Sequence, residues 1–254
     1  MRLSKIKKMV RLYRTETPII LTPAFVAAET LRYKQTDANV WNVDELKQSL
    51  HRLSHNKCAY CECNVNEESK YMEVEHFEDK HNNPDKVIEW NNLLPSCKKC
   101  NGAKSTHDVL SEPIVNPFEV DPRVHLKIKN YRFKWKTPVG KTTIGVVDLN
   151  NCDRAVAKRF AIGQAMHKSL ELAEERLVSY TAKGTTIWKN KLKSIVKELL
   201  KECQISAAYA ATCATLLHTD DTYIHIKSEM LRLSLWDSEC DLLHDSSMIL
   251  VMEN

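Results

Sequence analysis

The pattern of apolar and polar residues changes several times along the chain. Before residue 55, apolar positions recur at helical spacing, first in a basic amphipathic segment over 5–14 and later over 43–53. In the later segment Leu46, Leu50 and Leu53 would share one helical face, and Asp44 is placed to cap its start. Prolines interrupt the residues between. The pattern therefore predicts a helical N-terminal segment over 1–54, a candidate for docking on a partner.

A second change separates short strands from a long helical region. Alternating or β-branched residues over 124–128, 131–135 and 142–147 predict two or three strands, a short hairpin or meander. Beyond Cys152 an apolar residue follows every third or fourth position, which predicts helices over 155–180, 187–203, 206–217 and 222–235. The acidic C-terminal stretch has more apolar residues than a solvated tail needs, so we expect it to pack on these helices or on a partner. Residues 151–254 are thus expected to form a helical domain that contacts a partner or nucleic acid.

Composition narrows the class of protein. With 43% hydrophobic and 28% charged residues among 254, the chain has the profile of a globular α+β protein. No apolar run approaches the roughly 20 residues of a spanning helix, so no membrane association is expected. Prolines break the apolar stretch over 19–28 that a signal peptide would need, so we expect a cytoplasmic protein. Cytosolic thiols stay reduced, so the clustered cysteines among the nine are expected to bind metal.

Four of these cysteines have the spacing of a structural zinc site. Cys58 and Cys61 are two residues apart, as are Cys97 and Cys100, and each such turn presents two thiolates to one ion. Cys63 is a competing ligand that would bend the first turn differently. The remaining thiols have no paired spacing and are expected in the core: Cys152, Cys203, Cys213 and Cys240.

The residues between and just after the two cysteine pairs carry candidate chemistry. His76 is a suitable base for activating water near pH 7, and Glu75 and Asn101 offer the oxygen ligands that Mg²⁺ prefers. Residues this close in an extended strand point to opposite faces unless the strand bends, and a surface pair with a helix-capping Asn101 is the alternative interpretation. Three flanking histidines could add to the site but are more often exposed: His55, His81 and His107.

These residues occur in a known order. The segments 58–61, Val74-Glu75-His76-Phe77 and 92–104 together resemble the HNH endonucleases, whose ββα-metal core is supported by zinc. The resemblance implies an HNH nuclease core over 55–150, with His76 as the general base, Asn92 as the residue that orients it, and Asn101 as a ligand of catalytic Mg²⁺ or Mn²⁺. Glu75 stands where the family more often has Asp, so its direct metal coordination is the least certain of these roles.

Charge near the second cysteine pair is consistent with nucleic-acid binding. Residues 58–107 carry net negative charge between two basic stretches, a pattern that solvated helix faces also produce. Lys98, Lys99 and Lys104 surround the pair, and Lys104 is expected in the first turn of the helix that completes the ββα unit. Such lysines would contact phosphates without reading base sequence.

A narrower resemblance extends beyond the nuclease core. Segments at 113–122, 145–150 and 209–217 are similar to PtuB, the HNH subunit family of Septu-type anti-phage systems, including those attached to retrons. That resemblance implies an effector nuclease working with an SMC-like ATPase, PtuA, with DNA as the default substrate and RNA such as tRNA as the alternative. Two other functions stay open: a zinc-supported nucleic-acid-binding module without catalysis, and a stand-alone restriction or homing-type HNH nuclease.

Overall fold

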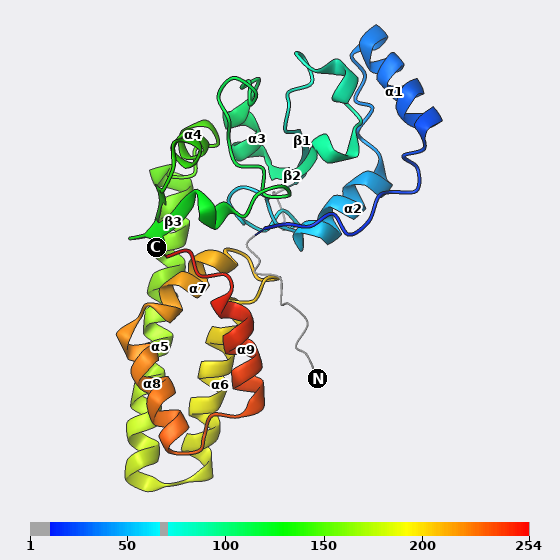
Figure 1. Ribbon diagram of the computed structural model, residues 1–254. Helices are drawn as coiled ribbons and strands as arrows, with labels where there is room; N and C mark the ends of the chain where they lie inside the picture. The colour runs from blue at the N-terminus through cyan, green and yellow to red at the C-terminus, as the bar shows by residue number, and fades with distance from the viewer. Residues whose placement is uncertain (1–10, 67–70, 254) are drawn as a thin grey trace. The chain divides into compact units, whose positions relative to one another are not determined.

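Two compact units make up the chain. A computed structural model describes residues 11–66 and 71–253. Residues 11–127 and 133–151 form one unit, called here the site unit, and residues 128–132 and 152–253 form the other, the helical unit (Figure 1). Within these described ranges, helices accompany two small two-stranded sheets, which confirms the mixed α and β class. Of the basic segment predicted over 5–14, residues 11–14 are not helical and the rest lies outside the described residues.

The site unit begins with two helices. α1 (Pro23–Thr36) starts inside the proline-interrupted stretch, because Pro23 takes a first-turn position that needs no N–H and the Thr22 hydroxyl caps the Phe25 amide. α2 (Asp44–Ser54) buries the apolar face predicted for it, with Leu46 and Leu50 fully covered. Asp44 does not cap this helix as predicted; it is the first helical residue, and the cap position belongs to Val43.

A strand–strand–helix element forms the centre of this unit. β1 (Met72–His76) and β2 (Leu93–Cys97) pair antiparallel, with Met72 opposite Cys97 and His76 opposite Leu93. Two short 3₁₀ turns, η1 (Pro84–Lys86) and η2 (Trp90–Asn92), lie on the connection between these strands. The helix α3 (Lys98–Lys104) follows β2 directly and packs on both strands, and α2 contacts β2 (Figure 1).

A second hairpin follows the turn η3 (Pro122–Val124). It consists of β3 (Leu126–Lys129) and β4 (Arg132–Trp135), as predicted. The third expected strand, over 142–147, is wrong: residues 142–146 belong to α4 (Pro138–Val146), and Val147 is its C-terminal cap. Thr137 caps that helix at the Gly140 amide, and the Thr143 hydroxyl donates to the Val139 carbonyl, so local capping overrides the strand preference of β-branched residues.

Five helices follow in the helical unit, after the π-turn η4 (Cys152–Val156); periodicity predicts the first four, and α9 was not predicted. They are α5 (Ala157–Lys183), α6 (Thr186–Glu202), α7 (Ala210–His218), α8 (Asp221–Arg232) and α9 (Ser238–Met248). α5 and α6 form a long antiparallel pair, with α8 against α5 and α9 against α6 (Figure 1). No helix in the described part of the chain is long and apolar enough to cross a bilayer.

The core of the helical unit contains the C-terminal stretch, as expected. Leu250 is buried in the same cluster as Leu170, Leu192 and Ile226, and the Met252 amide donates to the Thr215 hydroxyl at 2.9 Å. Three of the four cysteines outside the paired spacings are buried, as predicted: Cys203, Cys213 and Cys240. Cys152 is the exception, because the π-turn before α5 exposes it.

Two histidines give the helical unit an expected dependence on pH. His218 Nε2 lies 2.8 Å from Ser247 Oγ, and its ring meets the His244 ring edge-on at 4.7 Å. Burial, with nearby His244 and Lys227, lowers the pKa of His218 to about 4. As the pH falls, His218 is therefore protonated near pH 6.5 in the unfolded chain but only near pH 4 in the folded one. Protonation favours the unfolded chain, so the unit should lose stability as the pH falls from about 6.5 toward 4.

Hydrogen exchange of α7 and α9 amides at several pH values measures this loss. We expect faster exchange at pH 5 than at pH 7 after correction for intrinsic rates, and a weaker dependence in His218→Gln, which keeps a hydrogen-bonding side chain. The same pH dependence in both proteins would contradict this role of His218.

Candidate metal and hydrolytic site

The four predicted cysteine ligands converge at the junction of three segments. Cys58 and Cys61 lie on the turn after α2, Cys97 ends β2 and Cys100 lies in α3; all four are buried and their sulfurs lie within 4.8 Å of one another. Cys61 Sγ and Cys97 Sγ are 3.8 Å apart. A tetrahedral zinc site with bonds of about 2.3 Å places its sulfurs about 3.8 Å apart, so the donor set fits Zn²⁺.

Cys97 has a second role at the start of α3. Its sulfur accepts a hydrogen bond from the Cys100 amide at 3.5 Å and so caps this short helix. Hydrogen bonding from the Cys100 thiol lowers the pKa of Cys97, whereas hydrogen bonding to Cys58 raises the pKa of Cys100. The competing ligand Cys63 is not part of the four-sulfur cluster; its carbonyl accepts from the Cys58 amide and closes the turn.

A cavity of about 320 Å³ that is open to solvent lies between the end of β1, the loop that follows it, and α3. Three of the four predicted catalytic residues line it together: Glu75, His76 and Asn101, but not Asn92. Its other lining residues are Glu73, Asp79, Lys80, His81, Lys98, Gly102, Ser105 and Thr106. Although neighbours in a strand point to opposite faces, Glu75 and His76 both reach this cavity because β1 ends at His76.

The His76 ring is held in one orientation. Its Nε2 lies 2.9 Å from the Val87 carbonyl oxygen, and the Trp41 ring packs edge-on against it with centroids 4.7 Å apart. A carbonyl only accepts, so Nε2 carries the hydrogen and Nδ1 keeps a free lone pair. Burial lowers the pKa of His76 to about 4, so the imidazole is neutral at pH 7 and can accept a proton at Nδ1.

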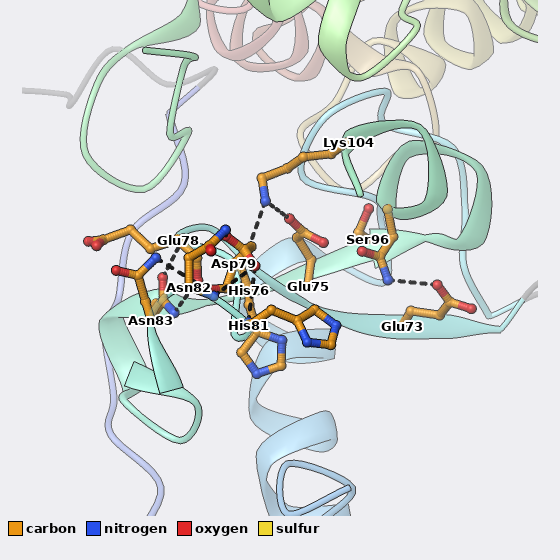
Figure 2. A network of polar contacts seen from close by, with 12 residues as sticks. Glu73, Glu75, His76, Glu78, Asp79, His81, Asn82, Asn83, Ser96 and Lys104 are labelled. Atoms are coloured by element: carbon orange, nitrogen blue, oxygen red, sulfur yellow. Dashed lines mark hydrogen bonds and ion pairs between the residues drawn. The ribbon is translucent and has the colours of Figure 1, made fainter. Parts of the chain in front are cut away.

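Glu75 is held by a buried lysine. Lys104 Nζ lies 2.7 Å from Glu75 Oε1 and donates to the His76 carbonyl at 2.9 Å, and both side chains are at most 3% exposed (Figure 2). Burial raises the pKa of Glu75 to about 7, against the opposing effect of Lys104. Lys104 therefore fixes the end of β1 and favours the carboxylate form of Glu75, while Glu75 Oε2 has no protein partner among the described residues.

Asn101 is oriented by a residue that the sequence analysis missed. Its Nδ2 donates to Glu73 Oε2 at 2.7 Å. Because Glu73 engages the amide nitrogen, Oδ1 of Asn101 is left for another ligand. Glu73 lies two residues before Glu75, so the two-residue period of a strand was the signal that could have identified it.

Asn92 supports the loop around His76 without touching the ring. Its Oδ1 accepts from the Glu78 amide at 2.7 Å, and its Nδ2 donates to the carbonyls of Glu78 and Lys86. Lys86 immediately precedes Val87, whose carbonyl holds His76. If Asn92 orients His76, as the family resemblance implies, it does so indirectly, by holding the backbone at Lys86 and Val87.

The three predicted phosphate-binding lysines differ in placement. Lys98 and Lys99 are exposed in the first turn of α3, and Lys98 lines the cavity. Lys104 is the last residue of α3, not a first-turn residue as predicted, and its buried ammonium is bound to Glu75. Of the flanking histidines, His81 lines the cavity, whereas His107 bonds to the Glu112 carbonyl away from it.

Two curated proteins are similar to this chain. Septu protein PtuB of Bacillus thuringiensis is 40% identical over 235 residues, which cover 91% of this chain and 90% of the relative. The chain belongs to the PtuB family. Septu protein PtuB of Bacillus mycoides strain KBAB4 is 26% identical over 192 residues, covering 56% of this chain and 63% of that protein. No protein-family model and no solved structure matches the chain, so the site of this PtuB-family protein is argued from its own geometry.

Proposed function

We propose that this PtuB-family chain is an HNH-type endonuclease that hydrolyses phosphodiester bonds with a catalytic Mg²⁺. The observation that carries the proposal is the fixed His76 ring, which shares one cavity with Glu75 and Asn101 on the strand–strand–helix element that also contains Cys97 and Cys100 of the four-cysteine cluster. Glu75 Oε2 and Asn101 Oδ1 are the oxygens that would hold the ion. When bound, Mg²⁺ would neutralise developing charge on the phosphate.

The chain's own residues divide the remaining work. His76 Nδ1 would take a proton from water, whose oxygen then attacks phosphorus as the bond to the leaving oxygen breaks. Val87 and Trp41 keep the ring in place for that transfer. Lys98, exposed at the cavity edge, would contact a flanking phosphate, and Lys99 would contact the backbone beside it.

Membership of the PtuB family extends the proposal to a biological setting. We propose that the protein acts in anti-phage defence together with an SMC-like ATPase of the PtuA type. The test is a degradation assay with plasmid DNA and total cellular RNA, each offered to the purified chain with and without the co-expressed ATPase in Mg²⁺. Degradation of one polymer would identify the substrate. Binding without cleavage under every condition would favour a zinc-supported binding module.

Removing Glu73 should weaken the use of Mg²⁺. In Glu73→Ala the Asn101 amide loses its partner and is free to rotate, so we expect a roughly 10- to 100-fold loss of activity or metal affinity. Cleavage rate measured against Mg²⁺ concentration would show the shift. Glu73→Gln, which keeps an acceptor oxygen, should retain more activity than Glu73→Ala. An unchanged Mg²⁺ requirement in Glu73→Ala would show that Asn101 does not depend on Glu73.

A further inference from the structure

The turn between α5 and α6 gathers positive charge around one tryptophan. Trp188, near the start of α6, has Lys191 Nζ 4.8 Å, Arg176 Cζ 5.2 Å and Lys183 Nζ 5.5 Å from its ring centroid. Arg176 and Lys183 come from the last two turns of α5, and the other two residues from α6. We call these four residues the basic tip. In the helical unit, this turn lies at the end away from α7 (Figure 1).

Positive charge at the basic tip is poorly balanced by carboxylates. The sequence contains no Asp or Glu between Glu175 and Glu198. Arg176 has Glu175 at 3.7 Å, but no carboxylate among the described residues lies within ion-pair distance of Lys183 or Lys191. Both lysines are exposed.

Further along α6, the lysines are paired with carboxylates. Lys193 and Lys197 face α9 and pair with Asp237, and Lys197 also pairs with Glu239. These two lysines are therefore neutralised within the unit. The unbalanced charge is confined to the basic tip and is not a general property of a lysine-rich helix.

The indole ring holds these cations together. A cation over an indole face is attracted by the ring's negative electrostatic potential, whereas cations around one ring repel each other. An arrangement of this kind is stabilised by a bound anion. Two or three cations held around a rigid ring fit a ligand with several negative charges better than a single carboxylate.

We propose that the basic tip is a second nucleic-acid contact, which binds the phosphodiester backbone outside the catalytic cavity. The choice of nucleic acid among polyanions rests on the proposed nuclease function. Because the cations occupy the ring faces, the tip would bind phosphates without reading bases. It would add affinity for any strand and place no requirement on its sequence.

The test measures binding in the full chain carrying His76→Ala, so that cleavage does not interfere. A fluorescein-labelled single-stranded DNA and its RNA counterpart are titrated at several salt concentrations. In Lys183→Ala/Lys191→Ala we expect weaker binding to every sequence, and a slope of log Kd against log salt that falls by about 1.4, or about 0.7 for each lost phosphate contact. Comparing the DNA and RNA titrations tells whether one backbone is preferred.

A matched variant controls for the change in net charge. Lys158→Ala/Lys168→Ala removes two exposed lysines from α5 away from Trp188 and should keep the parental slope. Trp188→Leu keeps an apolar side chain without the ring and should weaken binding as the tip variant does. Equal slopes in Lys183→Ala/Lys191→Ala and in Lys158→Ala/Lys168→Ala would overturn the proposal. So would a tip variant that binds nucleic acid as before but no longer binds phosphatidylserine vesicles. Absence of cleavage by the chain with His76 intact would refute the nuclease but leave a tip-dependent slope standing.

Discussion

Replacing Cys97 by serine is expected to abolish zinc binding and unfold the strand–strand–helix element. Four buried sulfurs surround one position, and a serine hydroxyl is a poor substitute for a thiolate ligand. In small zinc-binding peptides the metal contributes roughly 10–16 kcal/mol, which is folding free energy. Because serine is itself a good helix cap, the substitution preserves the capping role of Cys97 and isolates the metal's contribution.

Zinc content and limited proteolysis measure this effect together. Cys97→Ser should lack stoichiometric zinc and be cut within residues 58–104, while the helical unit stays resistant. Cys63→Ser is the matched control, since Cys63 is buried beside the cluster but outside it, and this variant should keep its zinc. A zinc-free, folded and active Cys97→Ser protein would refute the structural metal site.

Replacing His76 by alanine is expected to remove cleavage while leaving the fold and the zinc in place. General-base catalysis contributes roughly 10²- to 10⁴-fold to the rate, and the structure provides no second ring held in the same way at this cavity among its described residues. His76 is not one of the four sulfur ligands, so zinc content should be unchanged.

Single-turnover cleavage rates measure the loss of activity. His76→Gln, which preserves more of the volume packed against Trp41, should be as inactive as His76→Ala, because an amide does not act as a base. His107→Ala removes a histidine outside the cavity and should cleave at the parental rate. Substantial activity in His76→Gln would mean that another group activates the water.

The sequence predicts the residues of the site better than the contacts that hold them. Spacing alone identifies the four cysteines, and the motif order identifies Glu75, His76 and Asn101, which the structure brings to one cavity. Trp41 and Lys104 could not be assigned their contacts in this way, because they reach His76 and Glu75 from segments about 30 residues distant. Such contacts depend on tertiary packing, which no local pattern records.

Secondary structure was likewise predicted correctly where the local pattern is strong, and wrongly where it is short. The long helices α5 and α6 were predicted because apolar periodicity is strong over many turns. Residues 142–147 were expected as a third strand because a short β-branched run favours one locally, whereas the Thr137 cap starts the helix α4 just before them. Gly140 allows α4 to lie close to the His125 carbonyl, where a Cβ would clash.

The most direct test of a metal-dependent hydrolytic site is the cleavage rate of the zinc-loaded protein, co-expressed with the proposed ATPase partner, as Mg²⁺ is added to metal-free buffer. The account predicts no cleavage without Mg²⁺, a rate that rises to saturation as Mg²⁺ is added, and no response from zinc-loaded His76→Ala over the same range. Equal cleavage in metal-free buffer, or an equal response from His76→Ala, would contradict it.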